Sequence, residues 1–210
     1  MRAKVNVSAL FFRSHSVSGS CGIRAYLYIC RKQITMQQIK WFERKFNFDS
    51  EQNIFPSIIE RLTDAPLRLE HKLRSINPSI LKEKVNNTWS IQENAGHLSD
   101  LEPLWQGRFE DIKNGELELR PTDLQNTNTD LANHNNKTVE ELLRNFRRVR
   151  QQTVRMLENI DEELIFRSGL HPRLKTPMRT TDLFLFVAEH DDHHLARITE
   201  ITRLLTPREQ

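Results

Sequence analysis

The segment Glu189–His194, near the C-terminus, places three histidines inside an apolar helix. Steps of three or four residues from Leu183 give one continuous stripe: Leu183, Val187, His190, His194, Ile198, Ile201 and Leu205. This spacing is typical of the buried face of a bundle helix. Two imidazoles therefore occupy positions where a packed core normally holds leucine or isoleucine. Because burying an imidazole is costly unless its nitrogens find partners, the pair invites a metal ion.

His190 and His194 are four residues apart, so their rings project from adjacent turns of one helix face, within reach of a single ion. His193 lies about 100° around the helix from His194 and competes with it as the partner of His190. The stripe favours His194, because position 193 falls outside the apolar series. The alternative is that these histidines are hydrogen-bonded core residues without a metal, and spacing alone leaves both interpretations open.

His97, in the segment Asn94–Leu98, is the third candidate ligand. It lies two turns into an expected helix whose face continues through Leu101 and Leu104, and the small Gly96 precedes it. Taken alone, such a histidine is more often a core residue than a ligand. Three neutral imidazoles suit Zn²⁺, Ni²⁺, Co²⁺, Fe²⁺ or Cu²⁺. They leave a coordination position open for water or a thiolate, as catalytic sites do.

Four amphipathic segments must position these side chains. We expect helices over 54–76, 90–114 and 138–160, and a fourth that follows the loop 168–178 and carries the histidines. A long polar connection, 115–137, joins the second and third helices and is expected to be functional or to cover one end of the bundle. The pattern predicts an all-α protein, a four-helix bundle with long connecting loops and at least one crossover.

Capping boxes and prolines mark the ends of these helices. Ser90 with Glu93, and Thr138 with Glu141, each have the spacing in which side chain and backbone satisfy each other's hydrogen bonds. Pro66 is expected to kink the first helix, and Pro103 to bend the second about one turn after His97.

Composition limits the class of protein. Of the 210 residues, 37% are hydrophobic and 28% are charged, which indicates a globular chain, and no run approaches the ~18 apolar residues of a membrane span. Residues 1–35 hold six Lys and Arg and no acid, whereas the remainder holds 25 basic and 28 acidic residues. A mildly acidic domain argues against a nucleic-acid partner.

Residues 1–35 are interpreted as an unstructured leader or an over-called start, with translation beginning at Met36 and the domain spanning 36–210. Both cysteines, Cys21 and Cys30, lie in that segment. The domain therefore has no thiolate ligand and no cysteine nucleophile, which fits a cytoplasmic protein.

The motifs together resemble those of the DinB/YfiT-like superfamily. The resemblance rests on Trp89-Ser90-Ile91-Gln92-Glu93-Asn94-x-Gly96-His97-Leu98, on His171-Pro172, and on His190-x-x-His193-His194-x-x-x-Ile198. It spans about residues 50–205, with the pieces in the right order and at the right separations. Members often end the last motif with Arg-Gly-Gln, whereas this chain has Leu195-Ala196-Arg197, which is nearer to the YfiT-like branch.

The resemblance implies a four-helix bundle that holds one divalent metal ion, with Zn or Ni expected, through His97, His190 and His194. It also implies a metal-dependent hydrolase, or an S-transferase that uses a low-molecular-weight thiol such as bacillithiol or mycothiol. A homodimer is plausible on the same ground. The expected substrate is a small electrophilic molecule, and any thiol would come from solution. The alternative is a non-catalytic bundle that binds a metal or a small molecule.

Other polar residues near these motifs have weaker assignments. His134 and His171 lie in the two long loops and are candidates for a proton carrier or a substrate contact. Glu189, Asp191 and Asp192 either orient the imidazoles or form a solvated or interhelical ion-pair face, to which Arg197 could belong, and the second interpretation is favoured. The large apolar residues of these helices are expected in the core: Trp105, Phe109 and Phe184.

Overall fold

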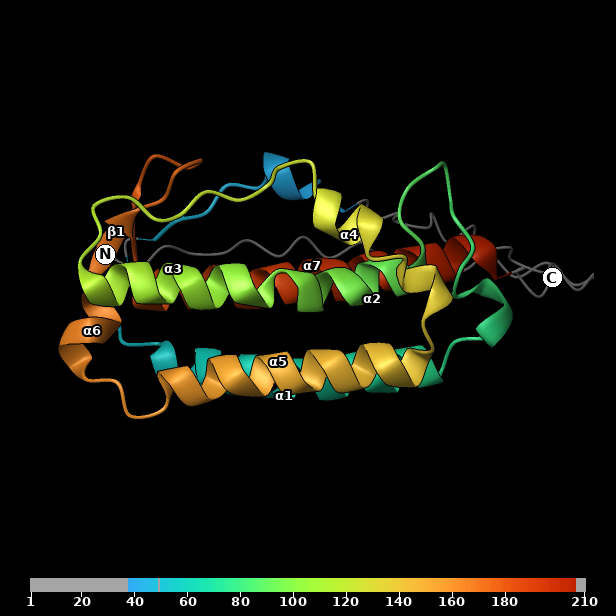
Figure 1. Cartoon of the computed structure of the whole chain (residues 1–210), viewed down its shortest axis with the longest axis horizontal. Coiled ribbons are helices and arrows are strands. Elements are labelled where there is room, and N and C mark those ends of the chain that lie inside the picture. Colours follow the sequence, from blue (N-terminus) through green and yellow to red (C-terminus); the bar gives the residue numbers. More distant parts are fainter. Residues whose placement is uncertain (1–37, 49, 207–210) are drawn as a thin grey trace, which may run out of the picture. The chain divides into compact units, whose positions relative to one another are not determined.

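Residues 38–48 and 50–206 are described by a computed structural model of the chain, so the predictions for residues 1–35 lie outside the described residues. The long helices are α1 (Phe55–Arg74), α2 (Ile91–Asp100), α3 (Glu102–Asn114), α5 (Val139–Leu157) and α7 (Thr180–Leu205). Because α3 continues the course of α2, these helices form four rods in two layers, α1 with α5 and α2–α3 with α7 (Figure 1). The predicted four-helix bundle is confirmed.

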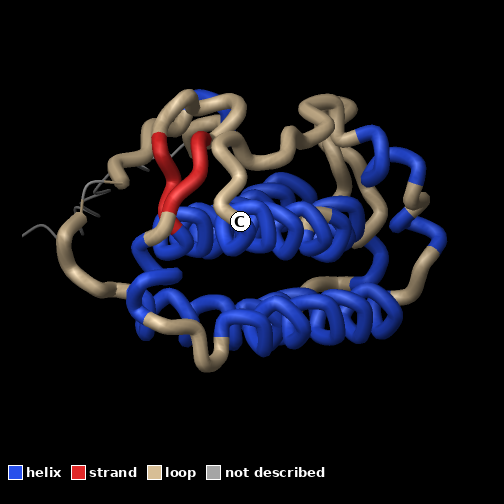
Figure 2. The backbone as a smooth tube through the Cα atoms, turned by 60° about the vertical axis from the view of Figure 1, so that its left-hand side comes forward, coloured by secondary structure: helices blue, strands red, loops and turns tan. Residues whose placement is uncertain are grey.

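Shorter elements occupy the connections. They are η1 (Trp41–Glu43), η2 (Pro78–Ile80), α4 (Thr127–Leu131), η3 (His134–Asn136), α6 (Glu162–Phe166), β1 (Ser168–Leu170) and β2 (Pro177–Arg179). The two strands pair antiparallel, with Gly169 opposite Met178. Figure 2 shows the hairpin and the other long connections on the outer side of the layer formed by α2, α3 and α7. None of the described helices is long and apolar enough to cross a membrane.

Both predicted capping boxes begin their helices. The Ser90 hydroxyl accepts a hydrogen bond from the Glu93 backbone N–H at 3.1 Å, and the Glu93 carboxylate accepts one from the Ser90 N–H at 2.8 Å. Thr138 and Glu141 make the same exchange at the start of α5. These bonds satisfy backbone donors that a helix leaves free at its N-terminus.

The second rod differs from its prediction as a single helix bent at Pro103. It breaks at Leu101, and Pro103 is the second residue of α3. A proline fits at that position because the first N–H groups of a helix have no partner within it. By contrast, α1 continues from Phe55 to Arg74 with Pro66 inside it.

The core is apolar along both layers, and the three large residues predicted to lie in it are buried. Trp105, Phe109 and Phe184 are 4%, 2% and 0% exposed and belong to one hydrophobic cluster. A second cluster lies toward the other end of the bundle and includes Leu69, Phe146 and Ile198.

One buried guanidinium interrupts this core. Arg150 of α5 is 1% exposed and donates to Glu102 Oε1 at 2.7 and 2.9 Å and to Asp191 Oδ2 at 2.5 Å. Its Nη1 also lies 3.3 Å from the carbonyl oxygen of Leu62. These partners belong to α3, α7 and α1, so one side chain contacts all four rods.

Asp191 therefore belongs to an interhelical ion pair, which was one of the two forms expected for these acids, but its partner is Arg150 and not Arg197. It is 2% exposed, and burial is the largest cause of its raised pKa. The helical period explains the difference, since Asp191 lies on the side of α7 that faces α5. Arg197 instead pairs with Glu200 at 2.6 Å.

Replacing Arg150 by methionine is expected to lower the free energy of unfolding by about 3–5 kcal/mol, because two buried carboxylates lose their common partner. Urea denaturation measures this change. Arg148→Met, on the exposed side of the same helix, is the matched control and should change stability by less than about 0.5 kcal/mol. Equal effects of the two substitutions would contradict a structural role for the buried ion pairs.

Candidate metal centre

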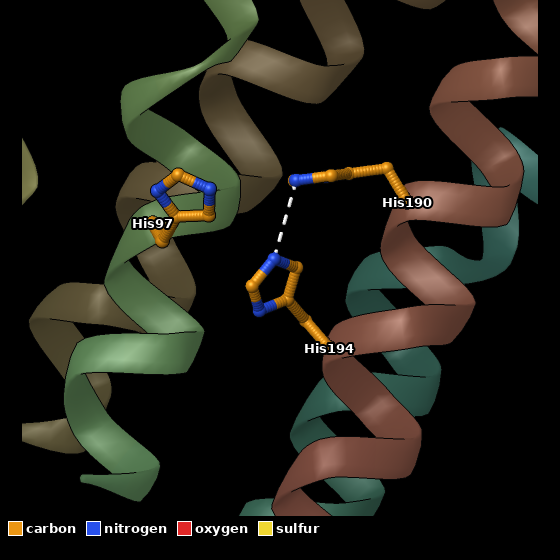
Figure 3. Close-up of side chains that lie close together, drawn as sticks. All are labelled: His97, His190 and His194. Carbon is orange, nitrogen blue, oxygen red and sulfur yellow. Dashed lines mark hydrogen bonds between the residues drawn. The ribbon is translucent and has the colours of Figure 1, made fainter. Parts of the chain in front are cut away.

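The three histidines proposed as ligands converge between two rods. His97 projects from α2, and His190 and His194 project from α7 (Figure 3). One ring nitrogen from each lies within 4.8 Å of the others, and all three residues are buried. Nε2 of His194 is 3.2 Å from Nε2 of His190. Among the described residues, these three form a group with the donor atoms and spacing to hold one metal ion.

A short chain of hydrogen bonds fixes the His97 ring. Its Nδ1 lies 2.9 Å from the hydroxyl oxygen of Thr129, and that hydroxyl donates to Asp100 Oδ2 at 2.8 Å. Because the hydroxyl proton is committed to the carboxylate, its oxygen must accept from the His97 Nδ1–H. This places the lone pair on Nε2, which is the ligating form of the ring.

An amide fixes His194 in the same way. Its Nδ1 lies 2.9 Å from Asn94 Oδ1. The Asn94 Nδ2 group donates to the carbonyl oxygens of Ser90 at 2.8 Å and of Trp89 at 3.2 Å, which makes Oδ1 the acceptor. His194 therefore also carries its proton on Nδ1 and its lone pair on Nε2.

His190 completes the group. With Nε2 of His194 as an acceptor, the proton of His190 lies on Nε2, and its buried Nδ1 has no hydrogen-bond partner within 38–48 and 50–206. Of the three inward-facing nitrogens, His190 Nε2 therefore carries a proton, whereas Nε2 of His97 and Nε2 of His194 carry lone pairs. This surplus of lone pairs in a buried place is what a cation would satisfy, so the residues present fit a divalent metal ion.

Burial keeps these rings neutral. It is the main cause that lowers the pKa of His97 to about 4, and it holds the pKa values of His190 and His194 well below the ordinary range. The like charges of neighbouring histidines act in the same direction. Neutral imidazole is the form that binds metals.

His193 lies beside this group but outside it. Its Nδ1 is 2.9 Å from Nε2 of Gln38, and its ring packs at a centroid distance of 5.4 Å from that of Trp41. Glu189 and Asp192 form ion pairs with arginines outside α7. Glu189 contacts Arg44 and Arg61, and Asp192 contacts Arg61 and Arg68. This agrees with the predicted ion-pair face, although Arg197 is not part of it.

His134 lies away from the cavity that adjoins the histidines. It is 1% exposed, and its Nε2 is 2.7 Å from Asp100 Oδ2, the same oxygen that holds Thr129. His134 was expected to carry protons or to contact the substrate. The structure places it where it supports the hydrogen bonds that orient His97.

Gly96 is required by this arrangement. A Cβ atom at residue 96 would lie 2.3 Å from the His134 ring. Gly96→Ala is therefore expected to lower stability by about 1–3 kcal/mol, although the same change in a solvent-exposed helix raises it by about 1 kcal/mol. Thermal and urea unfolding measure the effect.

The double variant Gly96→Ala/His134→Ala provides the control for this prediction. Removing the ring makes room for the new methyl group, so Gly96→Ala should cost less in the His134→Ala background than in the wild type. Additive effects would show that the ring does not cause the loss.

A cavity of about 440 Å³ opens beside the histidines. Its floor is one face of α2 and α3, from His97 through Leu101 and Trp105 to Arg108, together with Phe186 to Arg197 of α7. Segments 38–42 and 122–126, with His171 and Arg173 beyond β1, form its other walls. A space of this size takes a small organic molecule.

The three tryptophans of the chain all border the metal centre. Trp89 lies 4.6 Å from His97 between ring centroids, and Trp41 and Trp105 lie 5.0 and 5.7 Å from His190. They give the cavity apolar walls next to the ligands, which strengthens electrostatic interactions there by excluding water.

His171, the second loop histidine, lines the cavity and is 2% exposed. Its Nδ1 accepts from the backbone N–H groups of Arg173 and Leu174 at 3.2 and 3.1 Å, and its Nε2 is 3.0 Å from Nη1 of Arg108. Burial first, and then the charges of Arg108 and Arg173, lower the pKa of His171 to about 3. The ring is therefore neutral at physiological pH.

This depressed pKa predicts acid sensitivity. Below about pH 6.5 the unfolded chain protonates His171, whereas the folded chain does not until about pH 3, so acidification favours unfolding. His171→Asn should remove this contribution, about 1.4 kcal/mol per pH unit between pH 6 and 4. Urea denaturation of metal-free protein at several pH values measures the slopes, and parallel slopes for wild type and variant would contradict the assignment.

Several residues of the site were not found by sequence reasoning. Asn94 was quoted in a motif but given no role, and Thr129 and Asp100 were not considered. Asn94 precedes His97 by almost one helical turn, a position from which a polar side chain can reach the same site. Thr129 lies in a long connection, where no periodicity signals what it contacts.

Comparisons with known proteins agree with this fold. A family model described as the DinB superfamily matches residues 47–198. A solved structure with a TM-score of 0.66 and 22% identity covers 78% of this chain and 94% of its own. That structure is YfiT from Bacillus subtilis, described as "a probable metal-dependent hydrolase with an unusual four-helix bundle topology". No curated protein sequence matches. The match over most of the chain shows that this protein belongs to the DinB superfamily.

Proposed function

We propose that the protein is a metal-dependent enzyme that activates water or a low-molecular-weight thiol for attack on a small electrophilic substrate. The observation that carries this proposal is the set of three inward-facing imidazole nitrogens, two of them held in the ligating tautomer by Thr129 and Asn94. The description of YfiT as a "probable metal-dependent hydrolase" supports it, because the two proteins share a fold.

His97, His190 and His194 would hold the ion. A divalent ion with three protein ligands lowers the pKa of a water or thiol in its open position and polarises a carbonyl group. Zn and Ni are the metals we expect, since both accept imidazole.

The remaining residues orient and enclose the reactants. Asp100, through Thr129, keeps the His97 Nδ1 protonated, and Asn94 does the same for His194. Trp41, Trp89 and Trp105 limit the access of water and offer flat apolar surfaces to a substrate.

Hydrolysis and S-transfer differ in the nucleophile. Residues 36–210 contain no cysteine, so a thiol would enter from solution and share the 440 Å³ cavity with the electrophile. In either reaction the nucleophile loses a proton and forms a bond to the electrophilic carbon, while the leaving group departs with the electron pair of the bond that breaks.

Metal binding is tested by titrating chelator-treated protein with Zn²⁺ and Ni²⁺ in a calorimeter. Wild type should bind one ion per chain. His97→Ala and His190→Ala should each lose at least about tenfold in affinity, and His193→Ala, beside the site but outside it, should bind like wild type. A wild type that binds no ion, or a His193→Ala variant as weak as His190→Ala, would overturn the ligand set.

Activity is tested with chromogenic aryl esters and aryl halides, with and without added thiols. We expect turnover with the metal-loaded protein and its loss on chelation and in His190→Ala. Release of the chromophore without thiol identifies hydrolysis, and a thiol-dependent adduct identifies S-transfer. Tight metal binding without turnover of either probe class would favour the non-catalytic, metal-binding alternative.

A further inference from the structure

A buried charged side chain also faces the cavity, at a distance from the three histidines of the metal centre. Arg108 of α3 is 1% exposed and lines the cavity floor, with its Cζ 5.6 Å from the centroid of the Trp105 ring. It follows His97 by eleven residues on the same face of the α2–α3 rod, which corresponds to about 16 Å along a helix axis.

Arg108 has no acidic partner among the described residues. Its Nε donates to the carbonyl oxygen of Arg120 at 3.0 Å, and its buried Nη2 has no hydrogen-bond partner there. The carboxylate of Asp111 is close enough to interact electrostatically with Arg108, but both of its oxygens accept hydrogen bonds from Arg120. Arg150, the other fully buried arginine described above, differs because it forms ion pairs with two buried carboxylates. A buried cation of this kind is costly unless an anion joins it.

His171 does not supply that anion. A neutral imidazole carries one proton, but the contacts of both His171 nitrogens are with N–H groups. Two backbone N–H groups face Nδ1, and Arg108 Nη1 faces Nε2 at 3.0 Å. Whichever nitrogen is protonated therefore points its proton at a donor. Because the backbone groups cannot turn away, the surplus proton lies most favourably on Nε2, between the ring and Arg108.

We propose that Arg108 and His171 form a subsite for a carboxylate of the ligand that occupies this cavity. A carboxylate there would accept from Nη2 of Arg108 and from the Nε2–H of His171, and so supply both the missing charge and the missing acceptor. The inference rests on the proposed function, since it specifies the class of molecule that the metal centre acts on.

The positions of Arg108 and the histidines in the cavity determine which shape of ligand fits. With its carboxylate at Arg108 and its reacting group at the histidines, it would extend along the floor past Trp105 and Leu101, both of which line the space between. The fitting ligand is an elongated small molecule with an anionic end and an apolar or aromatic middle. The carboxylate belongs either to the electrophile or to the thiol, because both would occupy this cavity.

Tryptophan fluorescence tests the subsite, since Trp105 lies against Arg108. Metal-loaded wild type is titrated with 4-phenylbutanoate and with the uncharged 4-phenylbutanamide, and should bind the carboxylate at least about tenfold more tightly. Arg108→Gln should remove this preference and leave the affinity for the amide unchanged. Arg108→Lys should keep part of it, and Arg148→Gln, an exposed arginine on α5, all of it.

Repeating the titrations after chelation separates this subsite from the metal centre. The preference for the carboxylate should survive chelation in wild type. A preference that disappears on chelation, or that persists in Arg108→Gln, would overturn the proposal. Weak metal binding with an intact carboxylate preference would instead count against the proposed function alone.

Thermal unfolding shows whether a loss of binding in Arg108→Gln comes from misfolding of the variant. Because Arg108→Gln removes a buried charge without an acidic partner, its Tm should not fall below that of wild type. 4-Phenylbutanoate should raise the Tm of wild type and leave that of the variant unchanged. A variant that fails to fold, or a ligand that stabilises both proteins equally, would contradict the assignment.

S-methylglutathione serves as the thiol-derived carboxylate and distinguishes the two sources. If Arg108→Gln weakens the binding of 4-phenylbutanoate but not of S-methylglutathione, the subsite holds the carboxylate of the electrophile. If the substitution weakens the binding of both ligands, the subsite also accepts the carboxylate of the thiol. If it weakens neither, the subsite proposal is wrong.

Discussion

The buried guanidinium of Arg150 is the constraint on which the arrangement of the rods depends. It contacts Glu102, two residues beyond the end of α2, and Asp191, the residue that follows His190, and it reaches the backbone of α1. The partners of a buried charge cannot slide without exposing it unpaired. The ion pairs therefore hold α7 at one level relative to α2 and α3. At that level His190 and His194 face His97, so the metal centre is aligned by charges that do not belong to it.

The need of buried polar groups for partners also explains the two ends of the cavity. At the metal centre, Thr129 and Asn94 fix the Nδ1 protons of His97 and His194, and the lone pairs on the Nε2 atoms of these two rings face the same space. About three helical turns away the imbalance is reversed, because Arg108 and His171 present donors without an acceptor. Buried polar groups are normally satisfied. Two opposite deficits in one cavity are therefore the common basis of the two proposals, a cation at one end and an anionic group at the other.

Local patterns in the sequence were enough to predict the rods and the histidine face. The capping boxes located the starts of α2 and α5, and the apolar stripe separated His190 and His194 from His193. What the patterns could not predict are contacts between distant segments. The link from Thr129 to His97 and the two partners of Arg150 depend on how the rods pack, and no spacing along one helix encodes that. The partner of Asp191 was missed for this reason, because an interhelical ion pair was expected but Arg197, not Arg150, was the cation named for it.

The charge around the cavity favours anionic ligands. Its lining includes four basic residues, Lys40, Arg108, Arg173 and Arg197, and two acidic ones, Asp123 and Glu200. A divalent ion at the histidines would make the space more positive still, and a concave site with low-dielectric walls concentrates such a field. Anionic ligands would then be drawn in, whereas cationic ones would be repelled. Arg108 is the buried one among these four basic residues, and it has no acidic partner among the described residues, so it is the one at which an entering carboxylate would gain most.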